Sequence, residues 1–217
     1  MQNNKKSISR VLLVDLGGTN IRTATAIIGS KDVENTKKQN LDSLDSFDEM
    51  LQGFLDKDSS IKHIVFSIAG PKIHNSISMT NREFKIDKTD ILRKFKLDSC
   101  HILNDWESIG HSLSLFGNDE KIIINEGDPF NETELVLGPG TGLGAALVIQ
   151  DNIVLSTEIG NTLLSIPTLL KESDLSNIND FNVIEDLISG GGLATIYSYL
   201  SSSQKLPEEI VATYKSD

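Results

Sequence analysis

The sequence contains only one cysteine, Cys100, among its 217 residues. A single thiol excludes an internal disulfide and any metal site that needs several cysteines, and it is typical of proteins from a reducing compartment. The surrounding stretch, LDSCHILND, predicts that Cys100 is simply a small buried side chain. Histidine is also scarce, and the histidines lack the spacing of metal ligands; they are His63, His74, His101 and His111.

Positive charge is in deficit. Lys and Arg together number 20 against 31 Asp and Glu, which gives a net charge of -11 and predicts repulsion from nucleic acid and anionic membranes. The N-terminus has no apolar stretch of the signal-peptide type, and the longest uncharged runs, 135–150 and 187–204, are too rich in glycine or serine to span a bilayer. We therefore predict a cytoplasmic protein with neither a nucleic-acid nor a membrane partner.

Glycine, by contrast, is concentrated in two short segments, DLGGTN (15–20) and GPGTGLG (138–144). A dinucleotide-binding loop would need a helix directly after it, and a P-loop would end in Gly-Lys-Ser/Thr. Here both segments are followed by strand-like sequence, IRTATAII and AALVIQDNIVL, and neither carries the lysine. Both therefore read as strand–turn–strand loops, which disfavours the dinucleotide interpretation.

Two glycine loops of the same design favour a phosphate clamp, because backbone N–H groups without side chains can approach phosphate oxygens closely. Thr19 and Thr141 add hydroxyl donors, and Asp15, at the end of a strand, could hold Mg²⁺ through water. The alternative interpretation is a pair of tight β-turns without a ligand. The clamp would bind phosphates even in an acidic protein, since its donors belong to the backbone.

The order of elements predicts an α/β protein with two halves of similar design. An amphipathic helix is expected at 46–57, buried strands at 62–70 and 99–104, and a helix beginning at the polar pair Asn104-Asp105. Asp105 then stands just after a strand, where its carboxylate can be held to act as a general base. A plain helix cap is the other interpretation of the same position. We place the boundary between a first domain, 1–105, and a second, 106–217.

Six segments in collinear order resemble the bacterial-type glucokinases, members of the actin-like superfamily of sugar kinases and chaperone ATPases. They are LVDLGGTNIRTA, SIAGPKIHNSISMTNREFKID, LNDWESIGHSL, LGPGTGLGAALV, STEIGN and IEDLISGGGLATIY. The resemblance implies an actin-like (ribonuclease H-like) two-domain fold with mixed sheets. It also implies phosphorylation of glucose at the 6-hydroxyl, with ATP and Mg²⁺, as the first step of glycolysis.

The resemblance further implies roles for particular residues. Asp105 would be the catalytic base, and Asp15 would hold Mg²⁺ through water. The phosphate clamp would comprise Asp15, Gly17, Gly18, Thr19, Asn20, Gly138, Gly140, Thr141 and Gly142. The sugar ligands would be Asn81, Asn104, Asp105, Glu158, Asn161 and Glu185. The family often forms dimers, so a homodimer is one expected oligomeric state, with glucose or a related hexose as the small-molecule partner.

The sequence departs from the family pattern in two places. The family usually has histidine where this chain has Asn161, which cannot titrate near neutral pH. The resemblance also covers only the first two thirds of a family member, so the C-terminal part that contacts adenosine is expected to be missing. Two alternatives to an active glucokinase therefore stay open: a non-catalytic sugar-binding or regulatory remnant, and a kinase for another hexose.

Overall fold

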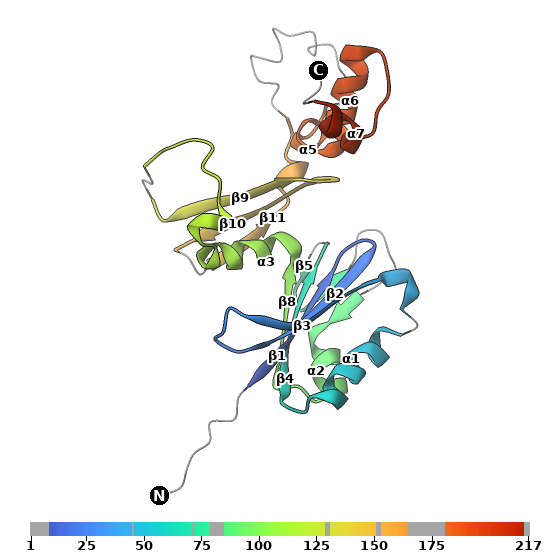
Figure 1. Ribbon diagram of the computed structural model, residues 1–217, viewed down its shortest axis with the longest axis vertical. Coiled ribbons are helices and arrows are strands. Elements are labelled where there is room, and N and C mark those ends of the chain that lie inside the picture. The colour runs from blue at the N-terminus through green and yellow to red at the C-terminus, as the bar shows by residue number, and fades with distance from the viewer. Residues whose placement is uncertain are drawn as a thin grey trace, which may run out of the picture. The chain divides into compact units, whose positions relative to one another are not determined.

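The structure is a computed structural model, and it describes residues 9–44, 46–70, 72–78, 85–128, 131–150, 153–164 and 181–214. The chain forms two compact units (Figure 1). The first unit contains residues 1–108 and 115–117, and the second contains residues 109–114 and 118–217. The division falls within one helix, close to the domain boundary that the sequence predicts. Within the described ranges, no helix combines the length and the apolar character that a membrane crossing requires.

The first unit is built on a mixed five-stranded sheet in the order β3–β2–β1–β4–β8. β1 and β2 pair antiparallel, as do β2 and β3, whereas β1, β4 and β8 run parallel to one another. The strands are β1 (Arg10–Leu16), β2 (Asn20–Ile27), β3 (Val33–Asn40), β4 (Ile61–Ile68) and β8 (Ser99–Asn104). The three parallel strands end together at one edge, which we call the carboxyl edge.

Two helices cover one face of this sheet, as Figure 1 shows. α1 (Phe47–Lys57) begins where the Ser46 hydroxyl accepts a hydrogen bond from the Glu49 N–H, and α2 (Lys88–Phe95) begins at the Asp87 carboxylate, which accepts from two backbone N–H groups. Their apolar sides and the alternate side chains of the strands form the core, which includes Leu12, Val14, Leu16, Leu51, Ile64, Phe66, Ile91, Phe95, Cys100 and Ile102. Cys100 is fully buried, as the sequence predicts.

The remaining elements of the first unit are short. β5, β6 and β7 form a small antiparallel sheet between β4 and α2, and η1 is a single 3₁₀ turn after β3. Their bounds are β5 (Lys72–Ile73), β6 (Ser76–Ser78), β7 (Lys85–Asp87) and η1 (Leu41–Ser43). The small sheet matters for the site because its first strand follows directly from the turn after β4.

The second unit contains an antiparallel three-stranded sheet in the order β11–β10–β9, followed by short helices. Its strands are β9 (Thr133–Pro139), β10 (Leu143–Ile149) and β11 (Ile153–Thr157). Its helices include η4 (Ile159–Asn161), α5 (Ile184–Leu187), α6 (Gly190–Ser201) and α7 (Pro207–Thr213). α3 (Asp105–Ser112) begins in the first unit and ends in the second, and the 3₁₀ turns η2 (Leu113–Leu115) and η3 (Asn118–Glu120) follow it.

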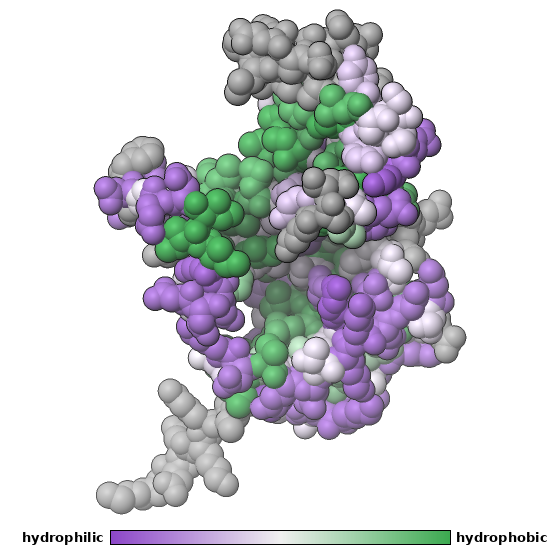
Figure 2. Space-filling model, turned by 45° about the horizontal axis from the view of Figure 1, so that its top comes forward, coloured by the Kyte–Doolittle hydropathy of each residue, from purple (hydrophilic) through white to green (hydrophobic). Residues whose placement is uncertain are grey.

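The two faces of the β9–β11 sheet differ in their covering. Gly110, in the second half of α3, packs so closely that a Cβ there would lie 2.6 Å from Val154 Cγ1. On the opposite face, Leu135, Leu147 and Leu155 lie in one cross-strand row, and Leu135 and Leu155 are 53% and 48% exposed. Figure 2 shows green, apolar surface over the part of the molecule that holds the second unit. Among the described residues of this unit, one sheet face is therefore largely exposed.

Candidate functional site

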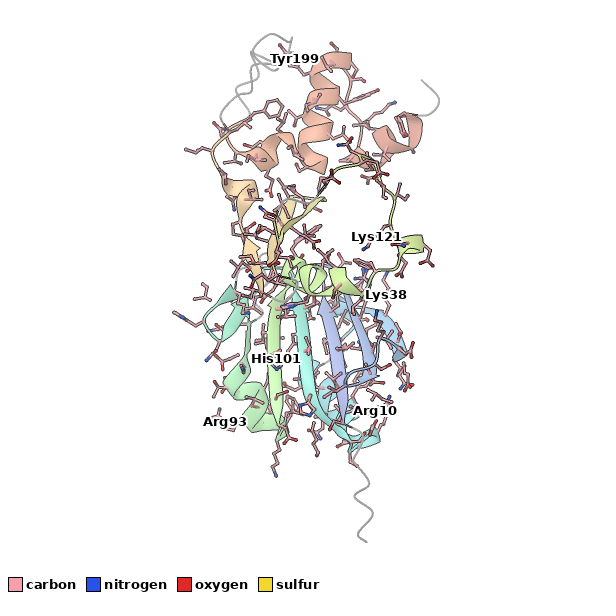
Figure 3. The ribbon with its side chains drawn as sticks, turned by 90° about the vertical axis from the view of Figure 1, so that its left-hand side faces the viewer. Arg10, Lys38, Arg93, His101, Lys121 and Tyr199 are labelled. Atoms are coloured by element: carbon pink, nitrogen blue, oxygen red, sulfur yellow. The ribbon has the colours of Figure 1, made fainter. Side chains whose placement is uncertain are left out.

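The carboxyl edge of the first unit brings together residues that are distant in the sequence. Asp15 lies beside Ser67 in the β1–β4 register, and Asn104 lies beside Ile68 in the β4–β8 register. In Figure 3, Arg10 marks the opposite end of β1. The end of each parallel strand thus brings a polar residue to the same edge, the position at which open α/β sheets bind ligands.

Asp105 is the first residue of α3 and follows β8 without a gap. One of its carboxylate oxygens accepts a hydrogen bond from the Trp106 N–H at 3.0 Å. Burial raises the pKa of this carboxyl group above its ordinary value, the hydrogen bond from the Trp106 N–H opposes that rise, and the negative charge of Asp15 adds to it. A carboxylate with a raised pKa is a stronger base, which suits proton acceptance.

Asp15 is paired with an arginine. Arg22 Nη1, on β2, lies 2.7 Å from one Asp15 oxygen, which leaves the other oxygen for a further contact. Lys38, which is labelled in Figure 3, lies opposite Arg22 in the register of β2 and β3. Among the described residues, no three His, Cys, Asp or Glu side chains cluster as metal ligands. Asp15 does offer the donor type that Mg²⁺ uses in kinase sites, where one or two carboxylates act together with water and substrate phosphates.

The first glycine loop is a tight turn between β1 and β2. The Gly17 N–H donates to the Asn20 carbonyl at 3.0 Å, and the Thr19 carbonyl accepts from the Leu41 N–H at 2.8 Å. A Cβ built on Gly18 would meet nothing within 4 Å, and Gly18 does not adopt a left-handed backbone conformation. Neither packing nor backbone strain therefore requires glycine at position 18, which fits a backbone that a ligand approaches.

Asn104 connects the strand end to the helix start. Its Oδ1 accepts from the Trp106 N–H at 2.9 Å, and its Nδ2 donates to the Gly70 carbonyl at 3.1 Å. The amide therefore caps α3 and also holds the turn after β4. A second hydrogen on Nδ2 remains for a ligand.

The second glycine loop joins β9 and β10. The Gly140 N–H donates to the Gly142 carbonyl at 2.8 Å, and the Gly140 carbonyl accepts from the Gly190 N–H, at the start of α6, at the same distance. Gly138 pairs with Gly144 across the two strands. A Cβ on Gly140 would point into open space, as at Gly18. The loop is thus fixed by its own backbone and by α6, while its tip stays bare.

Glu185 of α5 reaches the same loop. One carboxylate oxygen accepts from the Leu143 N–H at 2.7 Å. A Cβ on Gly142 would lie 2.4 Å from this oxygen, and a Cβ on Gly160 would lie 3.1 Å from it and 2.9 Å from the Leu143 carbonyl. The Glu185 carboxylate therefore occupies the space beside Gly142 and, together with the Leu143 carbonyl, the space beside Gly160. A cavity of about 310 Å³ is lined by Thr141 and Glu185 together with residues at the start of α6.

Glu158 and Asn161 flank this arrangement. Glu158 is exposed and precedes η4, and its carbonyl accepts from the Asn161 N–H at 3.0 Å. Gly160, between them, is buried against the Glu185 side chain. The short turn thus places Glu158 and Asn161 on either side of the residue that contacts Glu185.

The predicted site residues fall into two groups, one in each unit. The first unit holds Asp15, Gly17, Gly18, Thr19, Asn20, Asn104 and Asp105, and the second holds Gly138, Gly140, Thr141, Gly142, Glu158, Asn161 and Glu185. Asn81 lies outside the described residues. Glu107, Lys72 and Arg22 are absent from the residues predicted from sequence. The Asn104-x-x-Glu107 spacing is a capping-box signature and would have indicated Glu107; no sequence pattern indicates Lys72.

The fold resembles those of solved sugar kinases. The structure is similar to the crystal structure of a glucokinase from an Antarctic psychrotroph, with a TM-score of 0.80, 22% identity and coverage of 96% of this chain and 71% of that one. It is also similar to the glucokinase of Balamuthia mandrillaris solved in complex with glucose, with a TM-score of 0.57, 21% identity and coverage of 99% and 67%. The fold is therefore the actin-like fold of sugar kinases.

The family follows from the sequence. The sequence model of the glucokinase family matches residues 12–215, and this chain belongs to that family. The glucokinase of Colwellia psychrerythraea is 29% identical over an alignment of 215 positions that covers 92% of this chain and 63% of the relative. The chain thus spans somewhat less than two thirds of the length of that curated relative.

Proposed function

We propose that the protein phosphorylates glucose at its 6-hydroxyl with ATP as the phosphoryl donor. Asp105 accepts the proton of that hydroxyl while the oxygen attacks the γ-phosphorus of ATP, and ADP leaves. In such phosphoryl transfers positioning and charge neutralisation contribute most of the rate enhancement. The chain would act in the cytoplasm in carbohydrate metabolism, and the family resemblance makes a homodimer one expected assembly.

The observation that carries this proposal is the place of Asp105. It stands at the carboxyl edge of the same sheet as the first glycine turn, and burial and Asp15 raise the pKa of its carboxyl group. A helix cap would not need either neighbour, because Asn104 already provides the capping oxygen. The position therefore suits a base better than a cap.

The other residues have supporting roles in the proposal. The turn at Gly17, Gly18, Thr19 and Asn20, and the turn at Gly138, Gly140, Thr141 and Gly142, would lie against the phosphates. The Thr19 and Thr141 hydroxyls would donate to phosphate oxygens, as would backbone N–H groups other than those of Gly17 and Gly140, which bond within the turns. Asn104, Glu158, Asn161 and Glu185 would bind sugar hydroxyls, with Asn81 as a further ligand. Mg²⁺, held through water by the free oxygen of Asp15, would neutralise charge on the transferring phosphates.

The experiment is steady-state ADP production from MgATP with and without glucose. We expect glucose-dependent turnover that Asp105→Asn lowers by about 10²- to 10⁴-fold, the usual contribution of a general base. Asp98→Asn is the matched control, because Asp98 is an exposed aspartate that precedes the other end of β8. Equal turnover by Asp105→Asn and Asp98→Asn would contradict the role of Asp105. Glucose binding without turnover would support a non-catalytic sugar-binding protein instead.

A further inference from the structure

Glu107 is a buried acid that the proposed reaction does not yet use. Its residue is 8% exposed, and both carboxylate oxygens have partners. One oxygen accepts from the Asn104 N–H at 3.1 Å, and Lys72 Nζ lies 3.2 Å and 3.3 Å from the two oxygens. Burying a carboxylate costs free energy unless it is paired with a cation and hydrogen-bonded. The contacts with Lys72 and the Asn104 N–H compensate for this cost at Glu107.

The Asn104 N–H is the group that joins Glu107 to the proposed base. Asp105 is the next residue, and its carboxylate shares the Trp106 N–H with Asn104 Oδ1. Asn104 Oδ1 also accepts from the Glu107 N–H at 3.4 Å, so Asn104 and Glu107 cap each other. The first turn of α3 is therefore held by reciprocal bonds that enclose Asp105.

Lys72 extends this arrangement to a second element. It lies on β5, after the turn that follows β4, and the same turn provides the Gly70 carbonyl that accepts from Asn104 Nδ2. Two links thus run from residues 70–72 to the start of α3, one through Asn104 and one through Glu107. Both links hold the turn after β4 and the start of α3 in a fixed relative position.

We propose that Glu107, with Lys72 as its counter-ion, is a positioning residue that fixes the Asn104-Asp105 turn for proton acceptance. This inference rests on the proposed function, since it assigns Glu107 to the same site. Glu107 acts through the backbone of Asn104. Its loss should misplace the Asp105 carboxylate, and a misplacement of about 1 Å can cost on the order of 100-fold in rate.

The test compares two substitutions at Glu107 and one at Lys72. Glu107→Met keeps a side chain of similar length but removes the contacts with the Asn104 N–H and with Lys72. Glu107→Gln keeps an oxygen that can accept from the Asn104 N–H. Lys72→Met alone leaves a buried carboxylate without its counter-ion, so Lys72→Met/Glu107→Gln is measured beside it. The matched control is Lys94→Met, which breaks the half-exposed Lys94–Asp48 pair between α2 and α1 of the same unit.

Three readouts separate positioning from folding. Trp106 is the only tryptophan of the chain, so acrylamide quenching of its fluorescence reports on this turn directly. Amide hydrogen exchange of residues 104–107 reports on the Asn104 N–H bond. Turnover is measured at several temperatures below the unfolding transition of each variant, with kcat and KM for ATP determined separately.

In Glu107→Met, we expect acrylamide to quench the Trp106 fluorescence more readily. The amide hydrogens of residues 104–107 should exchange about tenfold faster or more, because a charge-assisted hydrogen bond is lost. Its kcat should fall by about 10- to 100-fold while KM for ATP changes little. Glu107→Gln should recover part of each loss, and Lys94→Met should match the unaltered chain.

Two results would overturn the proposal. One is a folded Glu107→Met chain with unchanged quenching and exchange at residues 104–107. The other is a kcat that returns to normal once the temperature is lowered, which would mean that Glu107 serves stability alone. If the unaltered chain has no turnover, the proposed reaction fails. Quenching, exchange and glucose affinity then still decide whether Glu107 holds the turn.

Discussion

Gly142→Ala would test the link between the second glycine loop and Glu185, the proposed sugar ligand. The added methyl group would lie 2.4 Å from Glu185 Oε2, well inside van der Waals contact. The carboxylate is the end of a flexible side chain, so we expect it to move away and to give up its 2.7 Å hydrogen bond from the Leu143 N–H. One methyl group would thereby displace the side chain of a predicted sugar ligand, although position 185 itself is not substituted.

Gly140→Ala is the matched control for this change. It adds the same methyl group two residues away, where no atom lies within 4 Å and the backbone is not left-handed. Replacing glycine by alanine at compatible positions stabilises a protein by about 0.4–1 kcal/mol through the unfolded chain. That gain is common to both variants and cancels in the comparison. The difference that remains is the hydrogen bond to a charged group, worth about 1.5–3 kcal/mol.

For a chain of this length, each kcal/mol shifts the melting temperature by about 2–4 °C. Gly142→Ala should therefore melt about 3–12 °C below Gly140→Ala in a calorimetric scan. Glucose affinity, measured by titration calorimetry, should fall only in Gly142→Ala. Gly140→Ala should instead raise KM for ATP, because its methyl group lies where phosphate is proposed to approach. Equal melting temperatures, or a glucose affinity lowered equally in both, would refute the reasoning.

Further predictions concern single residues of either unit. Because the folded-state pKa of Asp105 is raised, the ionised form of its carboxyl group opposes folding. Asp105→Asn should therefore raise the melting temperature at pH 7. The difference in melting temperature should shrink as the pH falls toward the ordinary aspartate pKa. Burial raises the pKa of Cys100 to about 11. A thiol reagent at pH 8 should therefore label Cys100 only after the first unit unfolds. Rapid labelling of the native chain would contradict the burial of this thiol. Asn161→His should lower KM for glucose if position 161 contacts the sugar, and an unchanged ranking across a panel of hexoses would argue against that contact.

Much of the fold was predictable because the local signals and the tertiary structure agree. The alternation of buried side chains along β1 and β4, the Ser46 cap of α1 and the glycine turns each have a short-range cause that is readable in the sequence. The predicted strands and helices of the first unit accordingly lie where the periodicity places them. The predicted roles of the site residues remain proposals, since their positions in the fold do not demonstrate binding.

The ion pairs at the carboxyl edge were not predictable in the same way. Arg22 meets Asp15 only because β2 pairs with β1 in one particular register, and Lys72 meets Glu107 across 35 positions. Such pairings depend on how strands and turns meet in three dimensions, and no short-range pattern encodes them. The close fit of Glu185 against Gly142 and Gly160 has the same origin, since it joins α5, β10 and η4.

The two units differ in how completely they bury their apolar side chains, and this bears on every functional test. The first unit has a continuous core between one sheet and two helices. In the described part of the second unit, the buried apolar residues are few; they are Leu143, Ala145, Ala146, Val148 and Ile210. The row through Leu135 and Leu155 stays exposed, as do Val211 and Tyr214. Exposed apolar surface of this kind promotes association. The second unit should therefore be the weaker one, and a loss of activity on dilution or warming would begin there, while Trp106 in the first unit still reports a folded turn.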